Sequence, residues 1–201
     1  MIRNLLVTLF LFFSTSIAFA QKLSWEEQFV VLINQERSSA NDREWAIYGA
    51  YANGFRGPLT INPRLTASAQ LWCNALKGSN YFDHYGYVTN QGYLRRSYYD
   101  WTQISRVWLP SKYNNYTDWT IRNEYFGVFP TASSENGYLG GGSRPRDIFN
   151  AWKAGTWNID PRLASGHYSN MINPRWIEVG IAKNTWGGGK NSCFADFADF
   201  R

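Results

Sequence analysis

Near the start of the chain, apolar side chains recur at the spacing of one helical face. The residues on that face are Trp25, Phe29, Leu32 and Ile33. Ser24 stands just before them and Glu27 follows three residues later, which is the spacing of a capping box. Because apolar residues three and four positions apart share one side of a helix, the pattern predicts an amphipathic helix over residues 24–37.

Capping residues and apolar spacing predict two further helices. Asn62 is a good capping residue, and Pro63 fits the first helical turn, where a backbone N–H group has no partner in the helix. The predicted buried face of this second helix contains Leu65, Ala69, Trp72, Cys73 and Leu76. Gly78 is expected to end it. A third helix is predicted over residues 145–154. Its apolar side holds Ile148, Ala151 and Trp152.

Toward the end of the chain the period changes from helical to alternating. In residues 176–182, isoleucine and valine side chains point one way and the intervening residues the other, as in a half-buried strand. A turn is expected at residues 187–189 and a second strand at residues 192–198. Helices followed by a small antiparallel sheet predict an α+β fold of the sandwich type rather than a doubly wound sheet.

An aromatic-rich stretch at about residues 85–132 has only weak periodicity. We expect a short helix at residues 93–101 and a strand within residues 119–129. Aromatic side chains bury large areas, so we interpret most of them as the apolar anchors of this insert. The alternative is a stacking platform for sugars beside Arg95 and Arg96. Its members would be Tyr98, Tyr99, Trp101 and Trp108.

The first 20 residues have the organisation of an export signal. Arg3 supplies positive charge, an apolar run covers residues 5–13, and small residues around Ala20 form a cleavage motif, so the mature chain is expected to start at Gln21. The run is shorter than the roughly 20 apolar residues of a membrane-spanning helix. We therefore expect a secreted protein, periplasmic if bacterial, without stable membrane insertion; an uncleaved anchor is the alternative.

The composition fits one soluble domain over residues 21–201, and we see no linker or internal repeat. The chain has 201 residues with 20 basic and 15 acidic side chains. Removal of the leader leaves 19 basic and 15 acidic residues, a net charge of +4 without a Lys/Arg block. Such a charge does not indicate nucleic-acid binding. We expect a monomer.

Cys73 and Cys193 are the two cysteines of the chain. In an oxidising compartment they are expected to form a disulfide, which would close a loop of about 120 residues and stabilise the fold by roughly 4–5 kcal/mol in the chain-entropy model. The alternative is a pair of buried thiols. No CxxC pair is present to suggest a structural zinc site.

Candidate chemistry centres on the two histidines of the chain, His84 and His167. Between them, residues 134–137 contain Glu135 in a small, polar stretch that we interpret as a loop. On residue type alone, most such histidines and glutamates have no special role, so these positions need further support.

That support is a resemblance carried by six short motifs in a fixed order. The motifs are residues 32–37 (LINQER), residues 59–65 (LTINPRL), Asp83-His84, Glu135-Asn136, Gly166-His167-Tyr168 and the strand at residues 176–182. In this order they make the chain resemble the CAP superfamily (cysteine-rich secretory proteins, antigen 5, pathogenesis-related 1), especially its bacterial secreted branch, over about residues 26–198. The resemblance implies a three-layer α-β-α sandwich with a small antiparallel sheet.

The resemblance also implies a site. In that family two histidines and two acidic residues line a central cleft and can hold zinc or another divalent metal. His84, Glu135 and His167 match three of these positions, and they are also the candidate catalytic residues. The second acid usually stands three residues after a Trp, where this chain has Gly155. The candidate acids to replace it are Asp83, Asp147 and Asp160.

The resemblance favours a protein that binds an extracellular glycan, lipid or cell-surface component. Asn136 and Tyr168, together with Tyr98 and Trp101 of the insert, are the expected ligand contacts. One alternative is a metal-dependent extracellular hydrolase, in which an open position on zinc activates water. The same His and Glu residues are also suited to acid–base chemistry without a metal. The second alternative is a non-catalytic interaction or toxin-like protein.

Overall fold

The computed structural model describes residues 22–39, 57–100, 102–154 and 166–200. Within these ranges the chain forms five α-helices and two four-stranded sheets. The helices are α1 (Trp25–Ser39), α3 (Pro63–Leu76), α4 (Trp119–Tyr125), α5 (Pro145–Ala154) and α6 (Gly166–Ile172), with a 3-10 turn η1 (Tyr113–Asn115). The strands are β1 (Thr60–Ile61), β2 (Gly86–Val88), β3 (Tyr93–Arg95), β4 (Gln103–Trp108), β5 (Tyr116–Thr117), β6 (Ala132–Gly140), β7 (Glu178–Gly187) and β8 (Lys190–Asp199).

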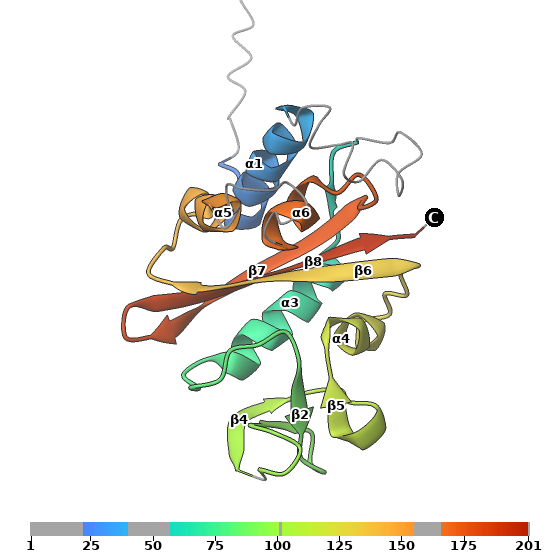
Figure 1. Ribbon diagram of the computed structural model, residues 1–201, viewed down its shortest axis with the longest axis vertical. Coiled ribbons are helices and arrows are strands. Elements are labelled where there is room, and N and C mark those ends of the chain that lie inside the picture. Colours follow the sequence, from blue (N-terminus) through green and yellow to red (C-terminus); the bar gives the residue numbers. More distant parts are fainter. Residues whose placement is uncertain (1–21, 40–56, 101, 155–165, 201) are drawn as a thin grey trace, which may run out of the picture.

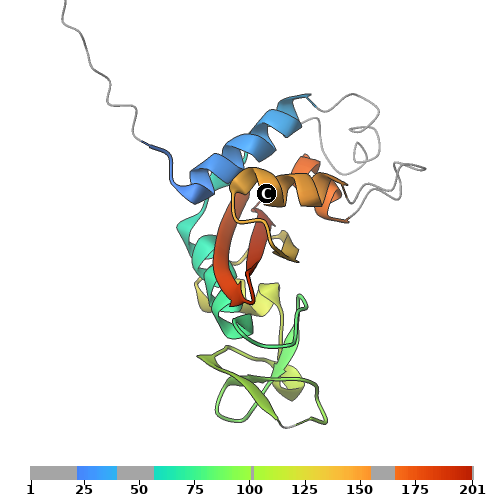
Figure 2. The same cartoon turned by 90° about the vertical axis from the view of Figure 1, so that its left-hand side faces the viewer.

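The main sheet has the strand order β1-β7-β8-β6. Strand β1 runs parallel to β7, and the other pairs are antiparallel. Helices α1, α5 and α6 lie over one face of this sheet and α3 lies over the other (Figure 1). Turned by 90°, the blue and orange helices and the green insert lie on opposite sides of the red strands (Figure 2). The expected α+β three-layer sandwich is therefore confirmed, with one parallel pair in its sheet.

Local signals in the sequence begin the two longest helices as predicted. At α1, Glu27 N donates to Ser24 Oγ at 3.1 Å and Ser24 N donates to Glu27 Oε2 at 2.6 Å, which completes the capping box. At α3, the Asn62 side chain accepts from Arg64 N at 2.8 Å. Each helix then buries its apolar face, α1 against α5 and α6 and α3 against the main sheet.

Helix α3 lies unusually close to the main sheet because of a glycine in β7. A Cβ atom placed on Gly180 would lie 2.0 Å from the backbone nitrogen of Thr66 in α3. Any other residue at this position would push the helix off the sheet. The close approach matters for function, since α3 ends just before the segment that carries His84.

The small sheet, with order β4-β3-β2-β5, and helix α4 make up most of the insert. Both predictions made within it are wrong. Residues 93–95 are strand rather than helix, because β3 pairs with both β2 and β4 and buries Leu94. The predicted strand at 119–129 is instead helix α4, which begins where the Asp118 side chain accepts from Ile121 N at 3.0 Å.

The expected disulfide is also wrong, since both cysteines are free and buried. Alternate residues of a strand point to opposite faces of its sheet. Cys193 on β8 packs in the core shared with α1, whereas Cys73 packs from α3 into the core on the other face. The sheet therefore separates the two thiols. Burial raises the pKa of Cys73 to about 12 and also raises the pKa of Cys193.

The predicted export signal, residues 1–20, lies outside the described residues, as do Trp101, Gly155 and Asp160. Among the helices that the structure describes, none has both the length and the apolar character needed to cross a bilayer.

Candidate functional site

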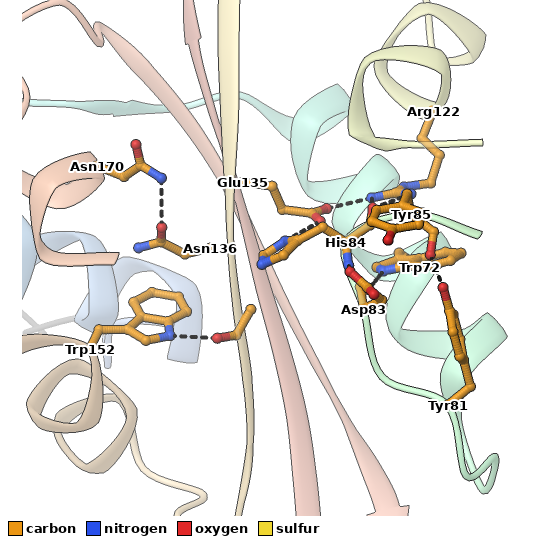
Figure 3. Close-up of polar contacts among 11 residues, drawn as sticks. Trp72, Tyr81, Asp83, His84, Tyr85, Arg122, Glu135, Asn136, Trp152 and Asn170 are labelled. Carbon is orange, nitrogen blue, oxygen red and sulfur yellow. Dashed lines mark hydrogen bonds and ion pairs between the residues drawn. The ribbon is translucent and has the colours of Figure 1, made fainter. Parts of the chain in front are cut away.

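A buried carboxylate holds a partly exposed histidine (Figure 3). His84 lies in the segment between α3 and β2, and its Nδ1 atom is 2.9 Å from Oε1 of Glu135 on β6. The Glu135 side chain is fully buried, whereas 33% of the His84 side chain is exposed. Glu135 therefore lies in a strand rather than in the loop expected from sequence, and it fixes the orientation of the His84 ring.

The second oxygen of Glu135 binds an arginine that the sequence did not single out. Arg122 Nη2, from α4, donates to Glu135 Oε2 at 2.5 Å, and both side chains are fully buried. The guanidinium also lies 4.2 Å from the ring centroid of Trp72 on α3. A buried charge needs a partner, so the guanidinium balances the carboxylate and leaves it bound on both oxygens.

The backbone around His84 is held from three sides. The His84 N–H group donates to Asp83 Oδ1 at 2.7 Å, and Trp72 Nε1 donates to the Asp83 carbonyl at 2.8 Å. Arg122 Nη1 donates to the His84 carbonyl at 3.3 Å. One arginine thus holds both the carboxylate and the backbone of the histidine. The position of His84 is fixed before any ligand arrives.

His167, on α6, lies beside His84 with 6.4 Å between the ring centroids. Burial lowers the pKa of His167, and the neighbouring His84 lowers it further. His167 is therefore neutral at neutral pH. Its carbonyl accepts from Asn136 Nδ2 at 2.8 Å, so adjacent residues of β6 position both histidines. The structure thus brings the three predicted residues His84, Glu135 and His167 together.

Two of the expected ligand contacts are used inside the protein. Asn136 is fully buried and accepts from Asn170 Nδ2 at 2.8 Å in addition to its bond to His167. Tyr168 is buried, and its hydroxyl donates to Glu36 Oε1 on α1 at 3.0 Å. These bonds hold α6 against β6 and α1. Contact of Asn136, Tyr168 or Trp101 with a ligand stays a prediction.

Asp196 is a buried acid that the sequence reasoning missed. It lies on β8 directly opposite Glu135 and is fully buried, and neither of its oxygens makes a hydrogen bond of good geometry with any residue that the structure describes. Desolvation raises the pKa of Asp196 well above its usual range, and the charge of Glu135 raises it further. The signal was present in the alternation of the strand, because Asp196 shares its face with Phe194 and Ala198.

This arrangement does not fit a metal ion. Among the described residues, no group of three or more His, Cys, Asp or Glu side chains is placed to hold one. Glu135 is bound on both oxygens, to His84 and to Arg122. Of the acids expected to replace the missing one, Asp83 accepts from the His84 backbone, and Asp147 pairs with Arg144 at the start of α5. The zinc site expected at His84, Glu135 and His167 is therefore not supported.

A line of tyrosines extends from His84 across the insert. Tyr85 follows His84 directly, and the successive ring pairs Tyr85–Tyr116, Tyr116–Tyr87, Tyr87–Tyr98 and Tyr98–Tyr99 have centroid separations of 5.9, 5.9, 5.9 and 5.1 Å. We call these five residues the tyrosine row. Tyr85, Tyr98 and Tyr99 are exposed, Tyr99 by 87%.

The tyrosine row differs from the platform expected from sequence. Arg95 is buried, with its guanidinium 5.2 Å from the ring centroid of Tyr98, and does not present its charge on the surface. Arg96 pairs with Asp100. Trp108 does not join the row and packs against Tyr125 on α4. The exposed aromatic side chains of this row are therefore tyrosines, and the His84 ring itself lies beside Trp119, with 6.2 Å between the ring centroids.

Comparisons with known proteins bear on this fold. The model of the CAP family, described as the cysteine-rich secretory protein family, matches residues 31–197. An extracellular protein containing a SCP domain from Bacillus anthracis matches with 15% identity and a TM-score of 0.50, over 87% of this chain and 40% of that one. This chain thus spans about two fifths of that protein's length.

Two further solved structures match at lower scores. An outer surface protein from Borrelia burgdorferi has 11% identity and a TM-score of 0.49, over 87% of this chain and 95% of that one. Venom allergen-like protein 4 from Schistosoma mansoni has 10% identity and a TM-score of 0.45, over 90% of this chain and 91% of that one. No curated protein matches the sequence. The family match covers most of the chain, and the chain belongs to the CAP family of cysteine-rich secretory proteins.

Proposed function

We propose that this protein is an exported CAP-domain protein that binds an extracellular glycan across His84, His167 and the adjoining tyrosine row. The observation that carries the proposal is that a row of aromatic rings, three of them exposed, begins at Tyr85, the residue that follows the rigidly held His84. Sugar rings stack on flat aromatic faces, and tyrosine hydroxyls add hydrogen bonds. Exposed tyrosines therefore favour a glycan over a lipid.

The proposal places the protein outside the cytoplasm. The organisation of residues 1–20 predicts an export signal. The Bacillus anthracis protein with the same domain is described as extracellular. Export would bring the protein into contact with the glycans of cell surfaces and of extracellular polymers.

Metal-free hydrolysis is a second candidate, favoured by the His84–Glu135 pair. When Glu135 accepts the proton of His84 Nδ1, the free electron pair of the ring is on Nε2. A histidine oriented in this way can take a proton from water, and Glu135 stabilises the charge that the ring then carries. His167, neutral at neutral pH, is beside it as a second proton carrier.

Binding should be tested first on the mature chain starting at Gln21. We would titrate it separately with soluble cell-wall and extracellular oligosaccharides and with lipid vesicles, using calorimetry. Tyr85→Ala and Tyr98→Ala should weaken glycan binding by about tenfold or more if a ring stacks on the sugar. Tyr113→Ala is the matched control, because Tyr113 is 91% exposed on the insert and outside the tyrosine row.

The same titrations separate the candidates. Binding of vesicles alone, or glycan binding that Tyr85→Ala and Tyr98→Ala leave unchanged, would overturn the proposal. Hydrolysis is measured by mass spectrometry of the oligosaccharides after incubation. Cleavage products that are absent with His84→Ala would support metal-free hydrolysis. Oligosaccharides that stay intact with the original chain would exclude it.

A further inference from the structure

A second surface of the insert is shaped as a small pocket. Its walls are the turn between β2 and β3 and the segment that runs from the end of β4 to η1. It encloses about 310 Å³, which is at the low end of the roughly 300–1,000 Å³ of small-molecule sites. It lies at the end of β2 that follows Val88, whereas His84 precedes the other end of this strand. The pocket is thus separate from the site described above.

The lining of this pocket combines one large aromatic face with uncharged hydrogen-bonding groups. The polar side chains come from Thr89, Asn90, Gln91, Ser111 and Asn115. The aromatic face is the indole of Trp108, which is 46% exposed. Asn and Gln each offer two donors and an acceptor, and the Ser and Thr hydroxyls offer both roles. Such a set suits a ligand that itself presents alternating hydroxyl donors and acceptors around an apolar ring face.

The absence of charged residues from the described lining of the pocket narrows the class of ligand further. None of the residues that line it, all of them described, is charged, although the chain as a whole carries a formal charge of +5. Lys112, which follows Ser111 in the chain, is paired with Glu124 of α4. A sulfated, phosphorylated or carboxylated ligand would lack a charged partner here, so a neutral ligand is favoured.

The walls are held in place without a ligand. Trp108 lies against Gly92, where a Cβ atom would come within 2.3 Å of the indole nitrogen, and its ring centroid is 5.1 Å from that of Tyr125. The Leu109 N–H group donates to the Gly92 carbonyl at 2.6 Å. Asn115, with a φ of 58°, donates from Nδ2 to Asn90 Oδ1 at 3.4 Å and so joins the two walls. Preorganised walls reduce the entropy lost on binding.

From this lining we infer a carbohydrate subsite: the pocket formed by Trp108, Asn90, Gln91, Ser111 and Asn115 binds one or two residues of a neutral saccharide, with the sugar ring stacked on the indole. The inference goes beyond the proposed function, because it concerns a different surface of the insert and does not require His84 or the tyrosine row.

The test is a titration of the mature chain with neutral oligosaccharides, namely N,N′-diacetylchitobiose, maltotetraose and cellotetraose. A heparin-derived tetrasaccharide is the charged comparison. Binding is followed by calorimetry and by the indole N–H signals in a ¹⁵N NMR spectrum. At least one neutral probe should bind and shift the Trp108 signal, which is assigned by its absence in Trp108→Ala.

Two pocket variants make the result specific. Trp108→Ala should weaken binding by about tenfold or more, since it removes the stacking face. Gln91→Ala should weaken it by about two- to tenfold through one lost hydrogen bond. Gln91 is exposed and lies in a turn, so this variant tests the pocket even if Trp108→Ala disturbs the insert. Tyr113→Ala, a matched exposed aromatic on the same segment that does not line the pocket, should bind like the original chain.

The inference would be overturned if no neutral probe bound more tightly than about 10 mM. It would also be overturned if Gln91→Ala and Trp108→Ala both bound the probe as tightly as the original chain, or if the chain bound the heparin fragment more tightly than the neutral probes. The proposed function fails separately. If Tyr85→Ala and Tyr98→Ala abolish saccharide binding while the pocket variants retain it, the tyrosine row is the binding surface and the pocket is not. If the pocket variants instead lose saccharide binding while Tyr85→Ala and Tyr98→Ala retain it, the pocket is the binding surface and the tyrosine row is not.

Discussion

Glu135 and Asp196 lie directly opposite each other on β6 and β8, both buried, yet within the described part of the chain only Glu135 forms an ion pair with Arg122. Arg122 and His84 bind the two oxygens of Glu135. Asp196 is likewise buried, next to Ser68 of α3, and desolvation raises the pKa of its carboxyl group. Two neighbouring carboxyl groups thus have different surroundings: Glu135 is paired with Arg122, whereas desolvation raises the pKa of Asp196 well above its usual range.

Replacing Asp196 by Asn should stabilise the protein increasingly as the pH rises. The pKa of Asp196 is raised in the folded state, so between the unfolded pKa, about 3.9, and the folded pKa only the folded chain binds the proton. Stability therefore falls with pH over this window, by up to about 1.4 kcal/mol per pH unit, and the variant lacks this loss. Urea unfolding at several pH values measures the difference, and parallel curves for the two proteins would contradict the prediction.

Replacing Glu135 by Ala should be strongly destabilising, because it leaves the Arg122 guanidinium buried without its anionic partner. Breaking a buried ion pair in this way costs about 3–5 kcal/mol in the free energy of unfolding. Asp147→Ala is the control, since it removes the partner of the exposed Arg144 side chain and should lower the free energy of unfolding much less. Similar losses of unfolding free energy in the two variants would contradict the prediction that the buried Glu135–Arg122 pair contributes more than the pair of Asp147 with Arg144.

His167 should titrate below the ordinary histidine pKa of about 6.5 in an NMR titration of the ring protons. Burial is the main cause, and the neighbouring His84 adds to it. His84→Ala should therefore raise the pKa of His167 part of the way toward its ordinary value. An unchanged pKa of His167 in that variant would mean that the two rings do not sense each other.

Zinc should not stabilise the fold, because both oxygens of Glu135 are already bound and no further acid among the described residues completes a site. A ligand that binds only the folded state raises the melting temperature by mass action. We therefore expect the same melting temperature with zinc and with a chelator. A rise that is lost in both His84→Ala and His167→Ala would contradict this and restore the metal site.

The two free thiols should react with a thiol reagent only after the protein has unfolded. Cys73 and Cys193 are buried on opposite faces of the main sheet, and burial raises the pKa of each thiol. A thiol reagent should react with neither cysteine in the folded protein and with both in denaturant. Reducing agent should leave the melting temperature unchanged. Loss of stability on reduction would instead indicate a disulfide.

The sequence predicted those elements whose apolar residues repeat regularly. Helices α1, α3 and α5 and strands β7 and β8 were found in this way. His84 and His167 were singled out differently, as the two histidines of the chain and by the resemblance of their motifs to the CAP superfamily. Strand β6 was missed because most of its residues, ASSENGYLG, are small or polar. It contains no β-branched residue, and Leu139 is its one large aliphatic residue. It becomes a strand through nine paired positions with β8. Tertiary pairing decides this segment, and local propensity does not.

The pairing of Glu135 with Arg122 was unpredictable for a related reason. Arg122 is 13 residues away in the chain, in an aromatic stretch whose helix is marked only by the cap at Asp118. Its role depends on α4 packing against α3, which brings the guanidinium over Trp72. The expected disulfide failed similarly, because the parity of Cys193 in β8 determines its face and a residue count does not. Contacts between distant segments define both.

The insert and the histidine site are mechanically one unit. The chain enters the insert immediately after His84 and leaves it through α4, whose Arg122 binds both the carboxylate of Glu135 and the carbonyl of His84. Opening of the insert would carry Arg122 away and leave the buried carboxylate without its counterion. The cost of that buried charge adds to the cost of opening, so the insert and the site share one local unfolding transition. We therefore expect a ligand that binds the insert to disfavour this opening and so to preserve the two Arg122 bonds that already hold His84 in place.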